Sequence, residues 1–119
     1  MPAIGFPSGK SGQTEIALTS VNLSTTNITT TAADIVSAAI VKKSITVALF
    51  NASDTLMWVS NDGGAAVAGD IPLPPAVGNN YGVVVLSRIT GTLAPNAISI
   101  IHGGTGNKVL YGFYTTGTG

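Results

Sequence analysis

The chain has 119 residues, of which five are Lys or Arg and five are Asp or Glu, so its formal net charge is zero. It contains no cysteine, which excludes a disulfide framework and a thiolate metal site, and its few scattered basic residues exclude an electrostatic surface for nucleic acid. Free monomers usually have about a quarter of their residues charged and a net charge away from zero, so the composition indicates a protein that is built to be assembled.

The length fits one domain, whose core should bury roughly two-thirds of the surface that the unfolded chain exposes. The longest apolar runs, such as 44–50 and 82–86, are far shorter than the roughly 20 residues of a membrane-spanning helix. The first ten residues lack the basic start and the unbroken apolar run of a secretory signal. We therefore expect no membrane partner and no export signal.

Apolar residues recur with period two from about residue 16, which indicates strands rather than helices. Residues 16–23 predict a strand with a one-residue bulge, and the Thr-rich stretch 25–31 favours extended chain. Residues 32–39 fit either a turn or two of helix or a strand with Ile35 inward and a bend at Ser37.

The next segment carries the clearest hairpin pattern in the chain. Residues 44–50 alternate as a strand, 51–54 (Asn-Ala-Ser-Asp) supply turn chemistry, and 55–60 form a second apolar segment. Asn, Ser and Asp favour turns because their side chains hydrogen-bond to nearby backbone. The sequence therefore predicts a hairpin, closed by the Asn-Asp-Gly-Gly turn at 61–64.

The second half begins with a proline-rich segment, 71–75, which cannot donate a continuous ladder of hydrogen bonds and must be an edge strand or a polyproline-like strap. Further strands with β-branched residues are expected at 81–87, 89–93, 97–101 and 108–114, with a glycine-rich turn at 103–106. Seven or eight short, closely spaced strands predict an all-β fold, either a single β-sandwich or a jelly-roll-like domain.

Both ends of the chain are rich in glycine and carry few apolar residues. We expect an extended N-terminal arm (1–14), a β-sandwich domain (15–114) and a C-terminal tail (115–119). Such segments seldom order by themselves. We therefore expect the arms to contact neighbouring subunits, with Ile4, Phe6 and Pro7 as partner-binding residues.

No arrangement of residues predicts an enzyme, a metal site or a cofactor. His102 is the sole histidine, and a strand-end histidine bonded to backbone or water explains it better than catalysis. The Gly-rich sequence 103–108 lacks the spacing and the following helix of a P-loop, so a β-turn is expected. Asp54, Asp62 and Asp70 lie in turn sequences and need no calcium ion to explain them.

Four larger aromatic side chains have two interpretations. Trp58, Tyr81, Tyr111 and Tyr114 could form a sugar-stacking platform if they converge outside the fold. Burial favours the other interpretation, in which Trp58 caps the core, because large aromatic side chains usually bury most of their area.

Lys42 and Lys43 precede the strongest predicted strand and are further candidates for partner binding. A basic pair at the start of a strand most often protects a sheet edge from aggregation. The pair could instead meet an acidic patch on a partner.

The runs 28–36 and 42–60 and the segment 69–75 (Gly-Asp-Ile-Pro-Leu-Pro-Pro) together resemble small structural proteins of tailed bacteriophages. In those proteins a Thr- and Ala-containing strand, a basic residue and an apolar strand ending in Asn-x-Ser/Thr precede the second strand of a hairpin. A glycine-rich turn and an Ile-Pro-Leu-type segment often follow. The resemblance covers about half of the chain, and the proline-rich insertion and the apolar C-terminal third depart from it.

The resemblance implies a non-enzymatic capsid decoration or cement protein, made in the host cytoplasm and located on the capsid surface of the virion. Its partner would be the major capsid protein, and it would be a homo-oligomer, with a trimer as one arrangement. Two alternatives stay open: a glycan- or receptor-binding head or fibre module, and a structural subunit of the tail, connector or fibre base.

Overall fold

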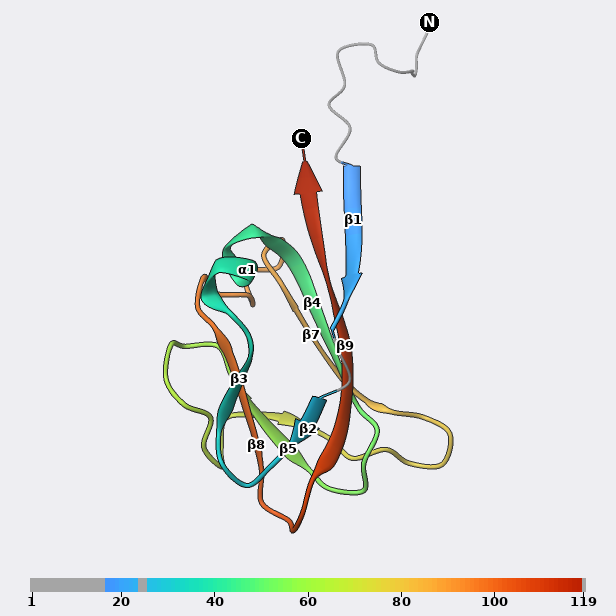
Figure 1. Ribbon diagram of the computed structural model, residues 1–119. Helices are drawn as coiled ribbons and strands as arrows, with labels where there is room; N and C mark the ends of the chain where they lie inside the picture. Colours follow the sequence, from blue (N-terminus) through green and yellow to red (C-terminus); the bar gives the residue numbers. More distant parts are fainter. Residues whose placement is uncertain (1–16, 24–25, 119) are drawn as a thin grey trace, which may run out of the picture.

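Two antiparallel β-sheets face each other in the computed structural model, which describes residues 17–23 and 26–118 (Figure 1). The five-stranded sheet contains β1 (Ala17–Asn22), β2 (Thr26–Ile28), β4 (Ser44–Asn51), β7 (Gly82–Ser87) and β9 (Lys108–Thr118). The four-stranded sheet contains β3 (Ala33–Val36), β5 (Met57–Ser60), β6 (Ile71–Leu73) and β8 (Ile98–His102). The predicted all-β sandwich is confirmed.

The strand order explains how the two layers are connected. The five-stranded sheet has the order β1-β9-β4-β7, with β2 also paired to β9, and the four-stranded sheet has the order β3-β8-β5-β6. The chain therefore changes sheet at every connection between consecutive strands except β1 to β2 and β5 to β6. The core lies between the layers, where alternating side chains of both sheets meet.

The core is built mainly from aliphatic residues on the inward faces of the strands. Its buried members are Ile28, Val36, Val41, Val47, Leu49, Met57, Val59, Leu73, Leu86, Leu93, Ile98, Ile100 and Leu110. Alternate side chains of a strand lie on opposite faces of the sheet. In β4, β7 and β9 the residues between the inward ones therefore lie on the solvent side of the sheet.

The predicted hairpin between 44–50 and 55–60 is wrong. β4 pairs with β7 and β9, whereas β5 pairs with β6 and β8. The turn residues are present, but they carry the chain from one sheet to the other. Asn51 stabilises this crossing, because its buried side chain bonds to Thr55 in the β4–β5 connection and to Leu73 of β6 in the second sheet.

Residues 32–39 contain parts of both predicted alternatives. β3 ends at Val36, and the helix α1 (Ala38–Lys43) begins directly afterwards, with the Ser37 side chain accepting a hydrogen bond from the Ile40 N–H. Ser is a favoured N-cap because it satisfies a backbone donor of the first turn. Val36 is buried, and Ile35, the expected inward residue, is partly buried and packs against the core.

Two further strand predictions need correction. Residues 89–93 form a turn rather than a strand, because the Ser87 carbonyl accepts hydrogen bonds from the N–H groups of Thr92 and Leu93. The pairing of β1 with β9 runs without a register shift from Ala17 to Asn22, so these residues contain no bulge. Residue 16 lies outside the described residues.

The proline-rich segment 71–75 behaves as expected. β6 is one of the two edge strands of its sheet, with Pro72 opposite Trp58 of β5. Pro at an edge leaves the sheet intact because its missing N–H would point to solvent.

The domain boundaries differ at the C-terminal end. β9 continues to Thr118 and pairs with β1 over its last residues, so residues 115–118 belong to a strand and not to a separate tail. β1 and the end of β9 extend as a two-stranded ribbon beyond the rest of both sheets (Figure 1). The expected N-terminal arm, 1–14, lies outside the described residues.

Candidate interaction surface

The solvent-facing side of the five-stranded sheet is unusually apolar. The register places Phe50 of β4 opposite both Val83 of β7 and Tyr111 of β9, and Ala48 opposite Phe113. With their neighbours at alternate positions, these residues form one surface, which we call the outer face. It consists of Phe50, Tyr81, Val83, Val85, Tyr111 and Phe113.

Aromatic stacking organises this face. The rings of Phe50 and Phe113 have centroids 5.9 Å apart, and those of Tyr81 and Tyr111 are also 5.9 Å apart. Offset stacking at such distances stabilises aromatic pairs beyond their burial. The stacked arrangement is therefore already present in the unbound chain.

Much of the outer face is open to solvent. Tyr81 is 51% exposed, Val83 47%, Val85 53% and Tyr111 41%. A contiguous apolar patch of a few hundred Å² on a protein surface often marks an interaction site. Single exposed apolar residues need no such explanation, but here those of β7 and β9 flank the partly exposed Phe50 of β4 on one face.

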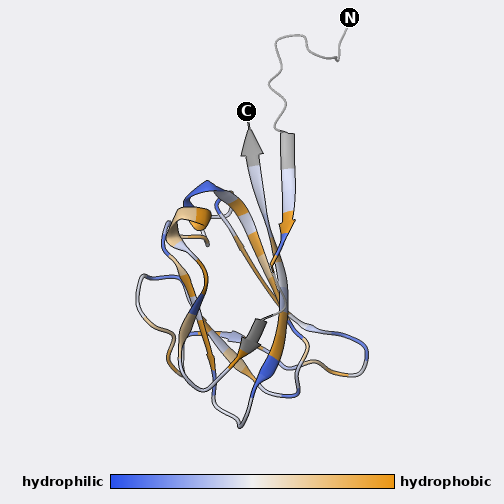
Figure 2. Cartoon of the chain, viewed as in Figure 1, coloured by the Kyte–Doolittle hydropathy of each residue, from blue (hydrophilic) through white to orange (hydrophobic). Residues whose placement is uncertain are grey.

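The face also lacks charge. β4 and β7 contain no charged residue, and β9 contains only Lys108. Figure 2 shows the apolar stretch of β4 beside the hydrophilic end of α1 that precedes it. A surface without charged groups loses little hydration energy when a partner covers it.

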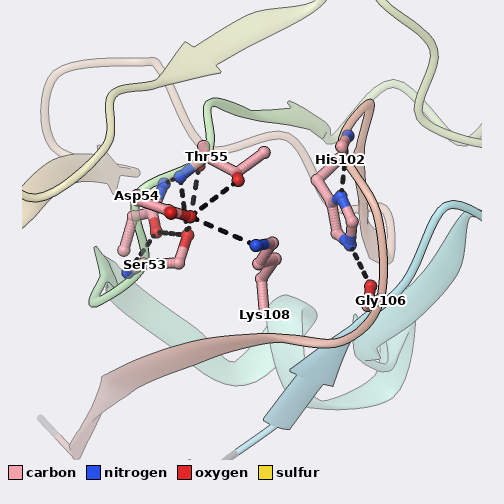
Figure 3. Close-up of polar contacts among 8 residues, drawn as sticks. Ser53, Asp54, Thr55, His102, Gly106 and Lys108 are labelled. Atoms are coloured by element: carbon pink, nitrogen blue, oxygen red, sulfur yellow. Dashed lines mark hydrogen bonds and ion pairs between the residues drawn. The ribbon is translucent and has the colours of Figure 1, made fainter.

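Lys108 is engaged away from this face. Its ammonium group lies 3.2 Å from Oδ1 of Asp54, which also accepts a hydrogen bond from the Thr55 hydroxyl at 2.9 Å (Figure 3). These hydrogen bonds, first that of Thr55 and then that of Lys108, lower the pKa of Asp54. Because Asp54 is largely exposed, the ion pair contributes little stability.

His102 is a structural residue, as predicted. It is 1% exposed; its Nε2 donates to the Gly106 carbonyl at 2.7 Å, and its Nδ1 accepts from the Gly104 N–H at 3.0 Å (Figure 3). The two bonds assign the proton to Nε2. Both ring nitrogens thus stabilise the glycine-rich bend at 103–106, in which Gly106 has a φ of 71° that favours glycine. The segment is a bend rather than a hydrogen-bonded β-turn, and it leads into the strand β9 and not into the helix of a P-loop.

The other two turn aspartates also bond within their own turns. Asp62 accepts hydrogen bonds from the Ser60 hydroxyl and the Gly64 N–H, which lower its pKa, and Asp70 accepts from the Val67 N–H. Across 17–23 and 26–118, no group of three or more His, Cys, Asp or Glu residues is placed to hold a metal ion. The turn interpretation of these aspartates is confirmed.

A shallow pocket of about 410 Å³ lies beside these turns. Its lining includes Asp62, Asp70, Ile71 and Thr92. The two carboxylates already serve as acceptors for their own turns. The pocket therefore offers few unsatisfied groups to a ligand.

The basic pair Lys42–Lys43 does not protect a sheet edge. Both residues lie in the last turn of α1, and the strand that follows, β4, is central in its sheet. Cations are favourable near a helix C-terminus, where carbonyl groups lack partners. The pair lies roughly 20 Å along β4 from Phe50, given the rise per residue of a strand, so it is not part of the outer face.

The arm residues and the aromatic side chains are the remaining predicted site residues. Ile4, Phe6 and Pro7 lie outside the described residues. Of the four larger aromatics, only Tyr81 and Tyr111 come together, while Tyr114 packs against the core.

The prediction that Trp58 caps the core is wrong. Trp58 points out of the four-stranded sheet, because its neighbours Met57 and Val59 are the inward residues. Its cross-strand partners are Pro72 and Ile101.

Comparisons of this chain with protein-family models, curated proteins and solved structures found no match. Within the described residues, no helix is long and apolar enough to cross a membrane.

Proposed function

We propose that this chain is a non-enzymatic structural protein of a tailed-bacteriophage virion, which binds the major capsid protein and stabilises the capsid shell. The observation that carries the proposal is the outer face, an uncharged surface of stacked aromatic and exposed valine side chains. The resemblance of 28–36, 42–60 and 69–75 to phage structural proteins supports the choice of partner. The protein would be made in the host cytoplasm and act at the capsid surface.

The proposed mechanism is stabilisation by binding. A protein that binds assembled subunits, and not dissociated ones, shifts the equilibrium toward the assembled shell. Contacts with several subunits at once add to this effect, because each further contact is intramolecular. The rigid outer face would supply the main contact, and the arm with Ile4, Phe6 and Pro7 would extend it to a neighbour.

A charge on the outer face should weaken shell binding. We expect Tyr111→Lys to weaken binding to purified shells of the encoding phage about 30-fold, because it removes a stacked aromatic group from the face and buries an unpaired charge. Co-sedimentation with shells gives the affinity. Shells saturated with the wild-type protein should also withstand higher temperature than bare shells.

The matched control is Val67→Lys. Val67 is 58% exposed in the 61–70 connection, away from the outer face, and the charge change is the same. We expect this variant to bind shells as the wild-type protein does. Equal loss in both variants, or no binding by the wild-type protein, would contradict the proposal.

The stacked Tyr81–Tyr111 pair favours one alternative, a glycan- or receptor-binding module, because sugar rings also stack on exposed aromatic groups. Glycan-array binding by the isolated protein that Tyr111→Lys abolishes would support that alternative. Absence of sugar binding together with shell binding would support the capsid role.

A further inference from the structure

One edge of the five-stranded sheet has backbone groups that no other strand within residues 17–23 and 26–118 uses. Among these described strands β7 pairs with β4 alone, and the Arg88 N–H donates to the Ile45 carbonyl at the end of this ladder. Because hydrogen-bonded and non-hydrogen-bonded pairs alternate between antiparallel strands, Val84 and Leu86 bond to β4. The N–H and C=O groups of Val83 and Val85 therefore point away from the sheet.

Ser87 marks where this open stretch ends. Its N–H donates to the Thr92 hydroxyl at 2.8 Å, and its carbonyl accepts from the Thr92 N–H at 2.9 Å. The groups of Ser87 that point outward are thus used by the chain's own turn. The outward N–H and C=O groups of Val83 and Val85 are therefore the ones that another strand could bond to.

The edges of the four-stranded sheet are protected in ways that β7 is not. β6 carries Pro72, and β3 carries the exposed Asp34 next to a register shift. Proline, charge and irregular pairing all oppose the addition of another strand. β7 has no proline, no charge and a regular register.

We propose that β7 pairs with β7 of a second copy of this chain, antiparallel, about a two-fold axis at Val84. In this register Val83 lies opposite the partner's Val85, and the two copies exchange four backbone hydrogen bonds. The axis places Val84 opposite the partner's Val84 as a non-hydrogen-bonded pair. The two five-stranded sheets then form one continuous sheet, whose outer faces are adjacent.

The distribution of charge permits this pairing. Residues 71–87 contain no charged side chain, so no like charges meet along the strand. Arg88, the next residue, donates to the carbonyls of Val41 and Lys42 and would lie opposite the partner's Asn80. Like charges directly opposite each other would destabilise a strand pair, and this register has none.

The surface area that this pairing buries indicates a weak association. Pairing of two strands of this length buries a few hundred Å² per copy, less than the roughly 800 Å² of a standard stable interface. We therefore expect a weak dimer, with a dissociation constant in the micromolar range. Binding of several copies to one surface would raise their effective concentration and favour the pair.

Cysteine cross-linking tests the register directly, because the chain has no cysteine of its own. Across a non-hydrogen-bonded pair the Cα atoms are about 4.5 Å apart, within the range of a disulfide. We expect Val84→Cys to form a disulfide-linked dimer under mild oxidation. Val85→Cys is the matched control: Val85 is 53% exposed, but its two copies would be about 9 Å apart, too far for a disulfide.

A second pair of variants tests the hydrogen bonds. Val85→Pro removes an outward N–H and leaves the ladder to β4 intact, whereas Val85→Thr keeps the N–H and the β-branched shape. In sedimentation velocity over a range of concentrations, we expect the wild-type protein and Val85→Thr to dimerise. We expect at least tenfold weaker association for Val85→Pro, with circular dichroism showing that it is folded.

The inference fails if the wild-type protein stays monomeric at several hundred micromolar, or if Val85→Cys cross-links as readily as Val84→Cys. It does not depend on the capsid role. Dimerisation through β7 by a protein that does not bind shells would contradict the proposed function alone, and shell binding by a strictly monomeric protein would contradict this inference alone.

Discussion

Gly82→Ala should unfold the protein at a much lower temperature than the wild type. A Cβ atom at this position would lie 1.7 Å from the carbonyl oxygen of Pro74 and 2.6 Å from its carbonyl carbon. Both are backbone atoms, which cannot rotate away as a side chain can. We expect a loss of about 3 kcal/mol or more in the free energy of unfolding, which lowers the melting temperature by roughly 10 °C.

The physical reason lies in the crossing of two segments. Gly82 opens β7 and pairs with Asn51, while residues 74–76 cross directly over it and bond to the β4–β5 connection through Ala76 N–H and Ser53 C=O. Any side chain at Gly82 must push this crossing segment outward.

Gly103→Ala is the matched control for this substitution. No atom lies within 4 Å of the Cβ position, and the residue does not have a positive φ. We expect a change within about 0.5 kcal/mol, measured by urea unfolding of both variants. Equal stability of Gly82→Ala and the wild-type protein would mean that 74–76 do not cross β7 as described.

Asn51→Ala should also be strongly destabilising. The Asn51 side chain is fully buried; its amide donates to the carbonyls of Thr55 at 2.7 Å and Leu73 at 3.2 Å, and its oxygen accepts from the Ser53 N–H at 2.9 Å. Alanine would leave these backbone groups without that partner, at about 1–3 kcal/mol for each group that water does not reach. We expect a loss of about 3 kcal/mol.

The control for Asn51 is an exposed asparagine, Asn107→Ala, in the turn before β9. Urea unfolding should show little change for it. Because Asn51 joins both sheets, the Asn51→Ala variant should also expose the backbone amide of Ser53 to faster hydrogen exchange. Unchanged stability of this variant would contradict the role of Asn51 as the connection between layers.

Alternation was enough to predict most strands. The pattern predicts the starts of β7, β8 and β9 within about a residue, because β-branched residues alternate between core and solvent there. The proline-rich segment contains β6, which lies at an edge, as the missing N–H of proline predicts.

Pairing between strands could not be predicted in the same way. Residues 51–54 have the composition of a hairpin turn, but the buried bonds of Asn51 direct the chain to the other sheet. Residues 89–93 have strand composition, but the hydroxyl and N–H of Thr92 bond back to Ser87 and form a turn. Both outcomes depend on contacts with residues that local sequence does not identify.

The outer face, too, could be predicted from the sequence only in part. The spacing of Tyr111 and Phe113 predicts that they share a face of a strand. That Phe50 and Val83 lie beside them follows only from the register of β4 with β9 and β7. Composition alone indicates the terminal arms and Lys42–Lys43 as candidate contacts, whereas the outer face follows only from the pairing of the strands.

The most direct test of the central claim is a cryo-electron microscopy reconstruction of the encoding phage's capsid with this protein bound. The account predicts that the outer face, with Phe50, Tyr81 and Tyr111, is buried against subunits of the major capsid protein. A reconstruction in which the protein is absent from the shell, or is bound with the outer face directed to solvent, would contradict it.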